Sequence, residues 1–236
     1  MIPEIIHQIW SGKDGPLPDL LKEWGQSWIK YHPGWKYELW DSGRINSFIH
    51  ECFPEYVDVY NQFPYDIQRW DAIRYLILWK TGGMYVDFDY ECLEPLGDIL
   101  RGKECCFSME PETHIHPESK EASRNFNNAL MACSPNHPFI MEIIKEVFSG
   151  KDPGYPASDK FHYVLSTTGP IVLMNTYEKY DHKDDIYLIP AELVSPLGVK
   201  EIRLLASGVK NQYFEYFEEK IKRAKAIHYF WGSWKQ

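Results

Sequence analysis

Residues 66–89 decide the fold of this chain and read DIQRWDAIRYLILWKTGGMYVDFD. Apolar residues recur there at helical spacing up to position 80, which predicts a helix with one apolar face. The residues of that face are Ile67, Trp70, Ile73 and Ile77. The pair Gly82-Gly83 ends the predicted helix, since glycine readily adopts the left-handed conformation of helix C-termini. Residues 84–88 then form a short apolar strand.

Two aspartates, Asp87 and Asp89, stand at the end of this predicted strand. Residues i and i+2 of an extended chain point to the same side, so we expect both carboxylates to face either one bound cation or one cation and one ribose. Carboxylate oxygens are hard ligands that suit Mn²⁺ or Mg²⁺, and these ions also bind diphosphate oxygens. The pattern alone is equally compatible with a solvated strand end that binds nothing.

The predicted helix carries a second charged pair, Asp71 and Arg74. Their i, i+3 spacing places both on one face of the helix that leads to the aspartates. A carboxylate accepts hydrogen bonds from sugar hydroxyls, and an arginine binds phosphate oxygens through two parallel hydrogen bonds. The alternative is an intrahelical salt bridge on a solvated face, but the apolar neighbours Trp70 and Ile73 favour a packed helix.

The chain opens with a predicted strand at residues 3–10, a helix at 18–30 and a second strand at 35–40. This order starts a β-α-β unit, so we expect an α/β fold with a largely parallel sheet covered by helices. Further strands are predicted at 104–109, 186–189 and 226–230, and further helices at 137–148 and 161–180.

A polar segment at residues 110–124 shows no periodicity and is predicted to be a functional loop or lid. No repeat or linker interrupts the 236 residues. Residues 1–236 are therefore predicted to form a single domain.

The composition is that of an acidic globular protein. Hydrophobic residues make up 44% and charged residues 25%, which predicts a substantial core. The formal net charge of −9, without a basic run, argues against nucleic acid as a partner. Aromatic residues reach 16% and either fill core and surface or stack on sugars and bases.

The cysteines and the first residues bear on location. Five cysteines without a CxxC spacing argue against a disulfide framework and a zinc ribbon, and they favour a reducing compartment. Residues 1–7 lack the charged and apolar regions of a signal peptide. No window reaches the ~18 apolar residues of a transmembrane segment. We therefore expect a cytoplasmic protein.

Other chemistry-bearing residues have simpler interpretations. His114 and His116 lie in a polar segment without further metal ligands and are predicted to be surface histidines. Cys105 and Cys106 lie in an apolar strand and are predicted core residues. The chain has no Gly-x-Gly-x-x-Gly, P-loop or Gly-x-Ser-x-Gly motif, which weakens dehydrogenase, kinase and serine-hydrolase interpretations.

The linked pattern D-x-x-R and G-G-x-Y-x-D-x-D, from Asp71 to Asp89, resembles glycosyltransferase family 32. That family includes yeast initiating mannosyltransferases and bacterial capsule and lipopolysaccharide sugar transferases, and it is distantly similar to clostridial glucosylating toxins. The resemblance implies a GT-A fold, which is a Rossmann-like nucleotide-sugar-binding fold. It also implies catalytic roles for Asp71, Arg74, Asp87 and Asp89, and donor binding by Tyr85 together with Asp71, Arg74 and Asp87.

Two further segments are similar to the family. Residues 3–10, PEIIHQIW, resemble its opening strand, where Trp10 is placed to stack on the base of the donor. Trp10 as a core residue is the alternative. Residues 128–132 resemble the segment beside the donor sugar, which implies donor binding by Asn128. Residues 168–170, Thr-Gly-Pro, match a family segment more loosely.

The C-terminal residues 226–234, AIHYFWGSW, resemble the closing segment of the family. By that resemblance His228 helps to hold the metal ion with the aspartate pair. Ser233 and Trp234 are implied to contact the diphosphate of the donor.

The implied function is a metal-dependent, retaining glycosyltransferase with Mn²⁺ or Mg²⁺ as cofactor. It would move a sugar from a nucleotide-diphosphate sugar to a glycan or glycolipid acceptor in cell-surface polysaccharide synthesis, and the acceptor could bring it to a membrane surface. The sequence does not select the donor. Two alternatives stay open, namely a nucleotide-sugar or glycan-binding module without turnover and a metal-dependent phosphohydrolase. The latter leaves Asp71, Trp10 and Trp234 without a role.

Overall fold

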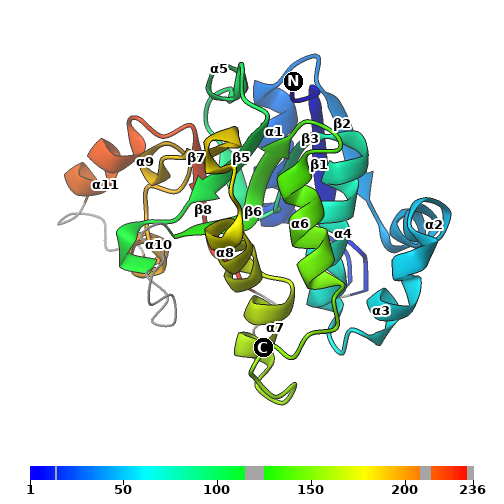
Figure 1. Cartoon of the computed structure of the whole chain (residues 1–236). Helices are drawn as coiled ribbons and strands as arrows, with labels where there is room; N and C mark the ends of the chain where they lie inside the picture. Colours follow the sequence, from blue (N-terminus) through cyan, green and yellow to red (C-terminus); the bar gives the residue numbers. More distant parts are fainter. Residues whose placement is uncertain (14, 115–124, 208–213, 233–236) are drawn as a thin grey trace.

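The computed structural model describes residues 1–13, 15–114, 125–207 and 214–232. Its centre is a six-stranded sheet with the strand order β2-β1-β3-β6-β5-β7 (Figure 1). The strands are β1 (Ile5–Ile9), β2 (Lys36–Trp40), β3 (Gly83–Val86), β5 (Cys105–Met109), β6 (Phe126–Cys133) and β7 (Ile186–Ile189). A second, two-stranded sheet pairs β4 (Tyr90–Cys92) with β8 (Ala226–His228).

The large sheet is mostly parallel, as predicted. Strand β1 pairs in parallel with β2 and β3, and β5 pairs in parallel with β7. Only β6 runs antiparallel to its neighbours β3 and β5. The predicted β-α-β unit is the segment from β1 to β2, whose connection includes the helix α1 (Asp19–Tyr31).

Helices cover both faces of the sheet (Figure 1). Alternate strand residues face opposite ways, so Tyr85 and Met131 join the core with α4, α6 and α8, whereas Met84 and Leu130 join the other core with Trp28 of α1. In the described part of the chain, no helix is long and apolar enough to cross a membrane. The remaining helices are α2 (Ser42–Cys52), α3 (Val57–Gln62), α4 (Asp66–Thr81), α5 (Gly97–Leu100), α6 (Pro138–Val147), α7 (Lys160–Thr167), α8 (Pro170–Lys179), α9 (Ala191–Val194), α10 (Val199–Ala206) and α11 (Phe214–Ile221).

The prediction of one helix at 161–180 was wrong. The chain forms α7 and α8, which are separated at Thr168 and Gly169. Pro170 is the first residue of α8, where its missing N–H is tolerated, and it cannot continue α7. The break directs the hydroxyl of Thr168 towards the helix α4, where it donates a hydrogen bond to Asp71.

The cysteines are core residues. Cys105 and Cys106 are both fully buried in β5, as predicted, and all five cysteines are free.

The turn between α4 and β3 requires its two glycines. Gly82 and Gly83 have φ angles of 63° and 100°, in the region that other residues avoid. A Cβ atom on Gly82 would lie 2.7 Å from Pro135, and one on Gly83 would lie 2.8 Å from the carbonyl oxygen of Ile5. The turn therefore packs β3 tightly against β1 and so positions Asp87, which directly follows β3.

His7 ties β1 to this turn as a neutral imidazole. The indole N–H of Trp40 can only donate, so Nδ1 of His7, 3.1 Å away, must accept. Nε2 then carries the proton and donates to the carbonyl oxygen of Gly82 at 3.0 Å. Burial lowers the pKa of His7 to about 4, since a second proton would face the Trp40 donor inside the core.

We expect the free energy of unfolding to fall as the pH is lowered from about 6.5 towards 4, because His7 then takes up a proton only when unfolded. The shift in the pKa of His7 corresponds to about 3 kcal/mol. Urea unfolding across this pH range measures the effect, and NMR titration assigns it to His7. A glutamine at this position, His7→Gln, should flatten the dependence. An imidazole of His7 that titrates near 6.5 would contradict the assignment.

Candidate active site

The carboxyl ends of three parallel strands meet the start of β6 at one edge of the large sheet. Trp10 follows β1, Asp87 follows β3 and Glu110 follows β5. Because β6 runs in the opposite direction, its first residues, including Asn127 and Asn128, lie at the same edge. Ligands of open α/β sheets bind at this edge.

A cavity of about 920 Å³ lies there. It is lined by every predicted site residue that the structure describes, namely Trp10, Asp71, Arg74, Tyr85, Asp87, Asp89, Asn128 and His228. Ser233 and Trp234 lie outside the described residues, so their roles stay predictions. Segments as far apart in sequence as 10 and 228 therefore contribute to one pocket.

Arg74 holds two of the carboxylates in place. Its guanidinium lies 3.1 Å from Oδ1 of Asp71 and 3.3 Å from Asp87. Nη1 also donates to the carbonyl oxygen of Asn128 at 2.9 Å. The side chains of Arg74 and Asp71 are only 4% and 7% exposed, which excludes a salt bridge on a solvated face. Arg74 thus links α4 to the ends of β3 and β6.

Asp71 is fixed through both of its oxygens. Nδ2 of Asn128 donates to Oδ1 at 3.0 Å, and Oγ1 of Thr168 donates to Oδ2 at 3.0 Å. Burial raises the pKa of Asp71 to about 6, although the guanidinium of Arg74 opposes this. A rigidly held carboxylate in a cavity wall is well suited to accept a hydrogen bond from a ligand hydroxyl.

Asp87 shares the same cluster. The hydroxyl of Tyr85 donates to its Oδ1, and the guanidinium of Arg74 lies 4.6 Å from the centre of the Tyr85 ring. Burial raises the pKa of Asp87, Arg74 lowers it, and the nearby Asp89 raises it again, with a net increase. Tyr85 therefore lines the cavity and orients Asp87 through this hydrogen bond.

His228 and Asp89 meet although 139 positions separate them in the sequence. The pairing of β4 with β8 sets Tyr90 opposite His228, and Nε2 of His228 lies 3.4 Å from Oδ1 of Asp89. The backbone N–H of Trp231 donates to the other oxygen of Asp89 at 2.9 Å. Burial raises the pKa of Asp89, but His228 and this N–H together bring it below its ordinary value.

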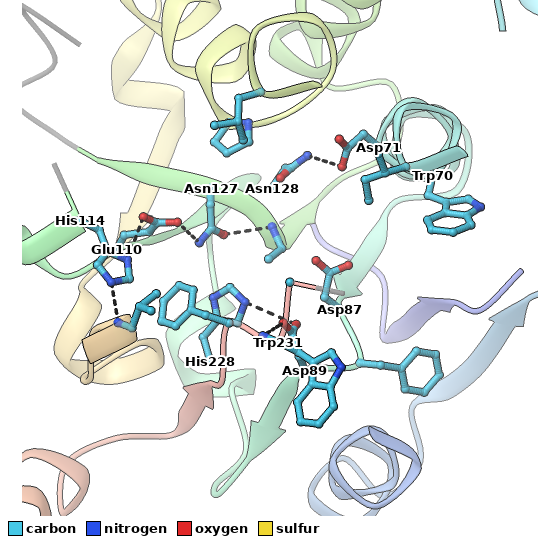
Figure 2. Close-up of a pocket in the computed structure, with 18 of the residues that line it drawn as sticks. Trp70, Asp71, Asp87, Asp89, Glu110, His114, Asn127, Asn128, His228 and Trp231 are labelled. Atoms are coloured by element: carbon cyan, nitrogen blue, oxygen red, sulfur yellow. Dashed lines mark hydrogen bonds and ion pairs between the residues drawn. The ribbon is translucent and has the colours of Figure 1, made fainter. Parts of the chain in front are cut away.

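Figure 2 shows Asp87 between Asp71 and the Asp89–His228 pair. No group of three or more His, Cys, Asp or Glu side chains within the described ranges is arranged to hold a metal ion. The chemistry of the donors does fit Mn²⁺ or Mg²⁺, because two carboxylates and an imidazole face one cavity. Nδ1 of His228 is buried without a hydrogen-bond partner among the described residues. The three-residue metal site stays a prediction.

Trp10 lies at the end of β1 and is half-buried. Its indole N–H donates to the carbonyl oxygen of Gly15 at 3.0 Å, which fixes the ring. The edge of the ring system meets Phe88 at 89°, with 6.1 Å between ring centres. A held aromatic ring that lines the cavity favours stacking on a ligand over the role of a buried core residue.

Comparison with known proteins agrees with this geometry. Residues 18–107 match the family model of the glycosyltransferase sugar-binding region containing the DXD motif. An uncharacterized glycosyltransferase of Acanthamoeba polyphaga mimivirus is 32% identical over 203 residues, which cover 84% of this chain and 75% of the viral protein. The chain belongs to this glycosyltransferase family. The predicted family is thereby confirmed.

Fungal members of the glycosyltransferase family are similar over much of the chain. Inositol phosphoceramide mannosyltransferase 1 of Schizosaccharomyces pombe is 31% identical over 91% of this chain and 60% of its own length. A mannosyl phosphorylinositol ceramide synthase of Saccharomyces cerevisiae is 30% identical over 76% of this chain and 43% of its own length. The chain thus spans about half of the length of these fungal relatives.

A solved structure supports the fold. The PaToxG glycosyltransferase superposes with a TM-score of 0.53 at 16% identity, covering 94% of this chain and 84% of that one. The observed α/β architecture is therefore that of a GT-A glycosyltransferase, as predicted.

As the chain belongs to a glycosyltransferase family, Trp10→Ala is expected to weaken nucleotide binding by about 1–3 kcal/mol, the range found for stacking of aromatic side chains on bases. The fold should be retained, because Trp10 lies at the rim of the core. Calorimetric titration with nucleoside diphosphates measures the first effect and thermal unfolding the second. An unstable variant with unchanged nucleotide affinity would instead make Trp10 a core residue.

The wall of the cavity across from Asp71 and Arg74 contains residues that were not predicted to belong to the site. Glu110 and Asn127 line it, and Nδ2 of Asn127 donates to Oε1 of Glu110 at 2.9 Å. Burial raises the pKa of Glu110, but hydrogen bonds from His114 and Asn127 outweigh burial and lower it. The sequence signals are the position of Glu110 directly after a predicted strand and at the start of the segment 110–124, which was predicted to be a functional loop. The first becomes informative once the strand order is known.

The prediction that His114 is a surface histidine was wrong. Its side chain is 14% exposed, it lines the cavity, and Nε2 accepts a hydrogen bond of 2.7 Å from the backbone N–H of Val199. A short 3₁₀ helix (Glu112–His114) turns it inwards. His116 and most of the predicted lid at 110–124 lie outside the described residues.

Proposed function

We propose that the chain is a metal-dependent, retaining glycosyltransferase that moves a sugar from a nucleotide-diphosphate sugar to a glycan or glycolipid acceptor. One observation carries the proposal: the Asp71–Arg74–Asp87 cluster, in which Asp71 and Arg74 are buried, and the Asp89–His228 pair line the same cavity. A binding module would need neither the number nor the burial of these charges, since burying charged groups is expensive.

Asp87, Asp89 and His228 would hold the metal ion. A bound Mn²⁺ or Mg²⁺ supplies Lewis-acid stabilisation of the charge that develops on the departing diphosphate. Asp89 is suited to this role because its pKa is low, which keeps it ionised at neutral pH.

The other residues would bind and orient the donor. Trp10 stacks on the base, and Asp71 accepts hydrogen bonds from hydroxyls of the donor sugar while Asn128 and Thr168 hold it. Arg74 keeps Asp71 and Asp87 at a fixed separation. Orientation of this kind is worth several kcal/mol, roughly 7–11 in favourable cases.

Retention of the anomeric configuration is implied by the family resemblance, and it restricts the possible reaction mechanisms to two. A double displacement needs a carboxylate nucleophile placed against the anomeric carbon. In a same-face attack the leaving phosphate assists deprotonation of the acceptor, so no protein base is needed. Our proposal uses the second route, in which the residues above bind and orient the reactants.

The names of the fungal relatives guide the choice of substrates. They are named as an inositol phosphoceramide mannosyltransferase and a mannosyl phosphorylinositol ceramide synthase. GDP-mannose is therefore the first donor to test, and a glycolipid is the first class of acceptor. We further propose that residues 1–236 work as one GT-A domain in the cytoplasm, with the acceptor as the link to a membrane surface and to cell-surface polysaccharide synthesis.

A thermal-shift screen of UDP- and GDP-sugars, with and without Mn²⁺, tests the donor and the metal together. A ligand that binds the native state raises the unfolding temperature by mass action. One nucleotide should stabilise the protein, and the shift should largely disappear in EDTA. The absence of a shift with every sugar nucleotide would contradict the proposal.

A further inference from the structure

Glu110 is a nearly buried carboxylate that the proposed donor site does not use. Its side chain is 10% exposed and lines the cavity. Among the described residues, its one ion-pair partner within 4 Å is His114, at 3.3 Å, and no lysine or arginine lies that close. A buried carboxylate without a strong cation is costly, so its position in a cavity wall points to a ligand.

Within the described ranges, three donors orient the carboxylate of Glu110 and leave one of its acceptor positions without a donor. Oε1 accepts from Asn127 at 2.9 Å, and Oε2 accepts from His114 and Asn125, each at 3.3 Å. A carboxylate has about four acceptor positions. The two donors on Oε2 fill that oxygen, so the remaining position is on Oε1.

The donors themselves are fixed. Oδ1 of Asn127 accepts from Ser108 at 2.9 Å and from the backbone N–H of Ala129 at 3.0 Å, so its NH₂ group must face Glu110. The N–H of Val199 occupies Nε2 of His114, which leaves the proton on Nδ1 to donate to Glu110. The carboxylate is thus held from β6 and from the first turn of α10.

The strand order separates this wall from the donor wall. Trp10 follows β1, the aspartate pair follows β3, and Glu110 follows β5, with β6 between β3 and β5. In Figure 2, Glu110 and His114 lie on one side of Asp87, and Trp70 and Asp71 lie on the other. A donor that reaches from Trp10 to the aspartate pair therefore leaves the Glu110 wall open to the second substrate.

The geometry points to Glu110 as an acceptor-binding residue. Oε1 accepts a hydrogen bond from a hydroxyl of a polyhydroxylated ring, either a sugar or a cyclitol, and His114 and Asn127 are its positioning residues. This inference rests on the proposed transferase function and adds the acceptor side to it.

The test compares two reactions of Glu110→Gln. The first is release of GDP from GDP-mannose with Mn²⁺ and water alone, and the second is the increase in that release on adding myo-inositol or methyl α-mannoside. Loss of one hydrogen bond to a charged group corresponds to an increase of about 10- to 100-fold in the acceptor KM. Release to water and the affinity for GDP-mannose should change by less than about twofold, since the described hydrogen bonds of Glu110 join His114, Asn125 and Asn127 and none of the residues proposed to bind the donor.

Matched variants guard against a structural explanation. Glu142→Gln makes the same change on the exposed face of α6 and should behave as the wild type. Gly198→Ala removes no functional group from the pocket, but its Cβ would lie 2.6 Å from Oγ1 of Thr113 and 3.1 Å from Nε2 of His114, so it should displace the imidazole that orients Glu110. It should raise the acceptor KM in the same direction as Glu110→Gln, with donor release unchanged. It also provides the test if Glu110→Gln does not fold.

Three outcomes would overturn the assignment. If Glu110→Gln lowers release to water as much as transfer, the residue serves the donor. If transfer is unchanged, Glu110 has no part in acceptor binding. If neither polyol stimulates the wild type, the ligand is not a simple polyhydroxylated ring. Failure of the wild type to release a nucleoside diphosphate from any GDP- or UDP-sugar in the presence of Mn²⁺ would instead contradict the proposed function itself.

Discussion

Asp89→Asn is expected to lower the rate of sugar transfer by about a thousandfold, the order of magnitude for loss of one strong electrostatic contribution at a reacting centre. The change removes the charge of the carboxylate that pairs with His228 and is proposed to hold the cation. The fold should survive, because the Oδ1 atom of asparagine can still accept the N–H of Trp231. Initial rates over a Mn²⁺ titration, with thermal unfolding as the stability measurement, give both quantities.

Asp98→Asn is the matched control, since Asp98 makes the same kind of contact with Arg101 but is 79% exposed. It should leave rate and stability unchanged, because exposed ion pairs contribute little. A wild-type rate and an unchanged Mn²⁺ requirement in Asp89→Asn would remove Asp89 from the metal site.

Arg74→Met is expected to destabilise the protein by about 3–5 kcal/mol, the range for removal of one partner of a buried ion pair. The variant leaves Asp71 buried, and Asp87 partly buried, without their shared counter-charge. Methionine fills much of the same space, so lost packing contributes little. Urea unfolding at neutral pH measures the difference. Arg101→Met, at a side chain that is 81% exposed, should change stability by less than about 0.5 kcal/mol.

The pH dependence of this deficit identifies its cause. Burial already raises the pKa of Asp71 to about 6 and also raises that of Asp87, and without Arg74 both carboxyl groups are protonated more readily when folded. Stability of the variant should therefore recover relative to the wild type as the pH falls towards about 6, because over this range the folded variant binds protons that the folded wild type does not. The double variant Arg74→Met with Asp71→Asn should also recover part of the loss. A deficit that is independent of pH would show that packing, and not charge, is responsible.

Local patterns predicted the part of the site that lies on one continuous segment. The i, i+3 spacing of Asp71 and Arg74 follows from helix geometry alone. The strand predicted at 84–88 was wrong at its end, because β3 ends at Val86 and the N–H of Tyr90 donates to the carbonyl oxygen of Asp87 at 3.2 Å, so a turn and not an extended strand brings the aspartate pair to the cavity. The Gly82–Gly83 pair marked the turn that joins these elements, and β1, α1 and β2 were predicted within a few residues. These features are local, so one segment of sequence contains the information.

Features that depend on strand order could not be predicted in the same way. Glu110 and His114 reach the cavity because β6 enters the sheet between β3 and β5 and runs antiparallel, which periodicity cannot indicate for a strand buried along its whole length. The break between α7 and α8 was missed because apolar residues continue across Thr168 and Gly169 at helical spacing. The proximity of His228 to Asp89 was expected from the family resemblance, and the structure brings the two together through β4 and β8.

The central claim is that this cavity breaks the bond between a sugar and a nucleoside diphosphate with the help of a divalent cation. The most direct measurement is the time course of nucleoside diphosphate release from GDP-mannose and UDP-hexoses by the purified protein. We expect release that requires Mn²⁺ or Mg²⁺, is abolished by EDTA and is lost in Asp89→Asn. Tight donor binding without release would show a binding module, and release at the same rate in EDTA would contradict the role assigned to the aspartate pair.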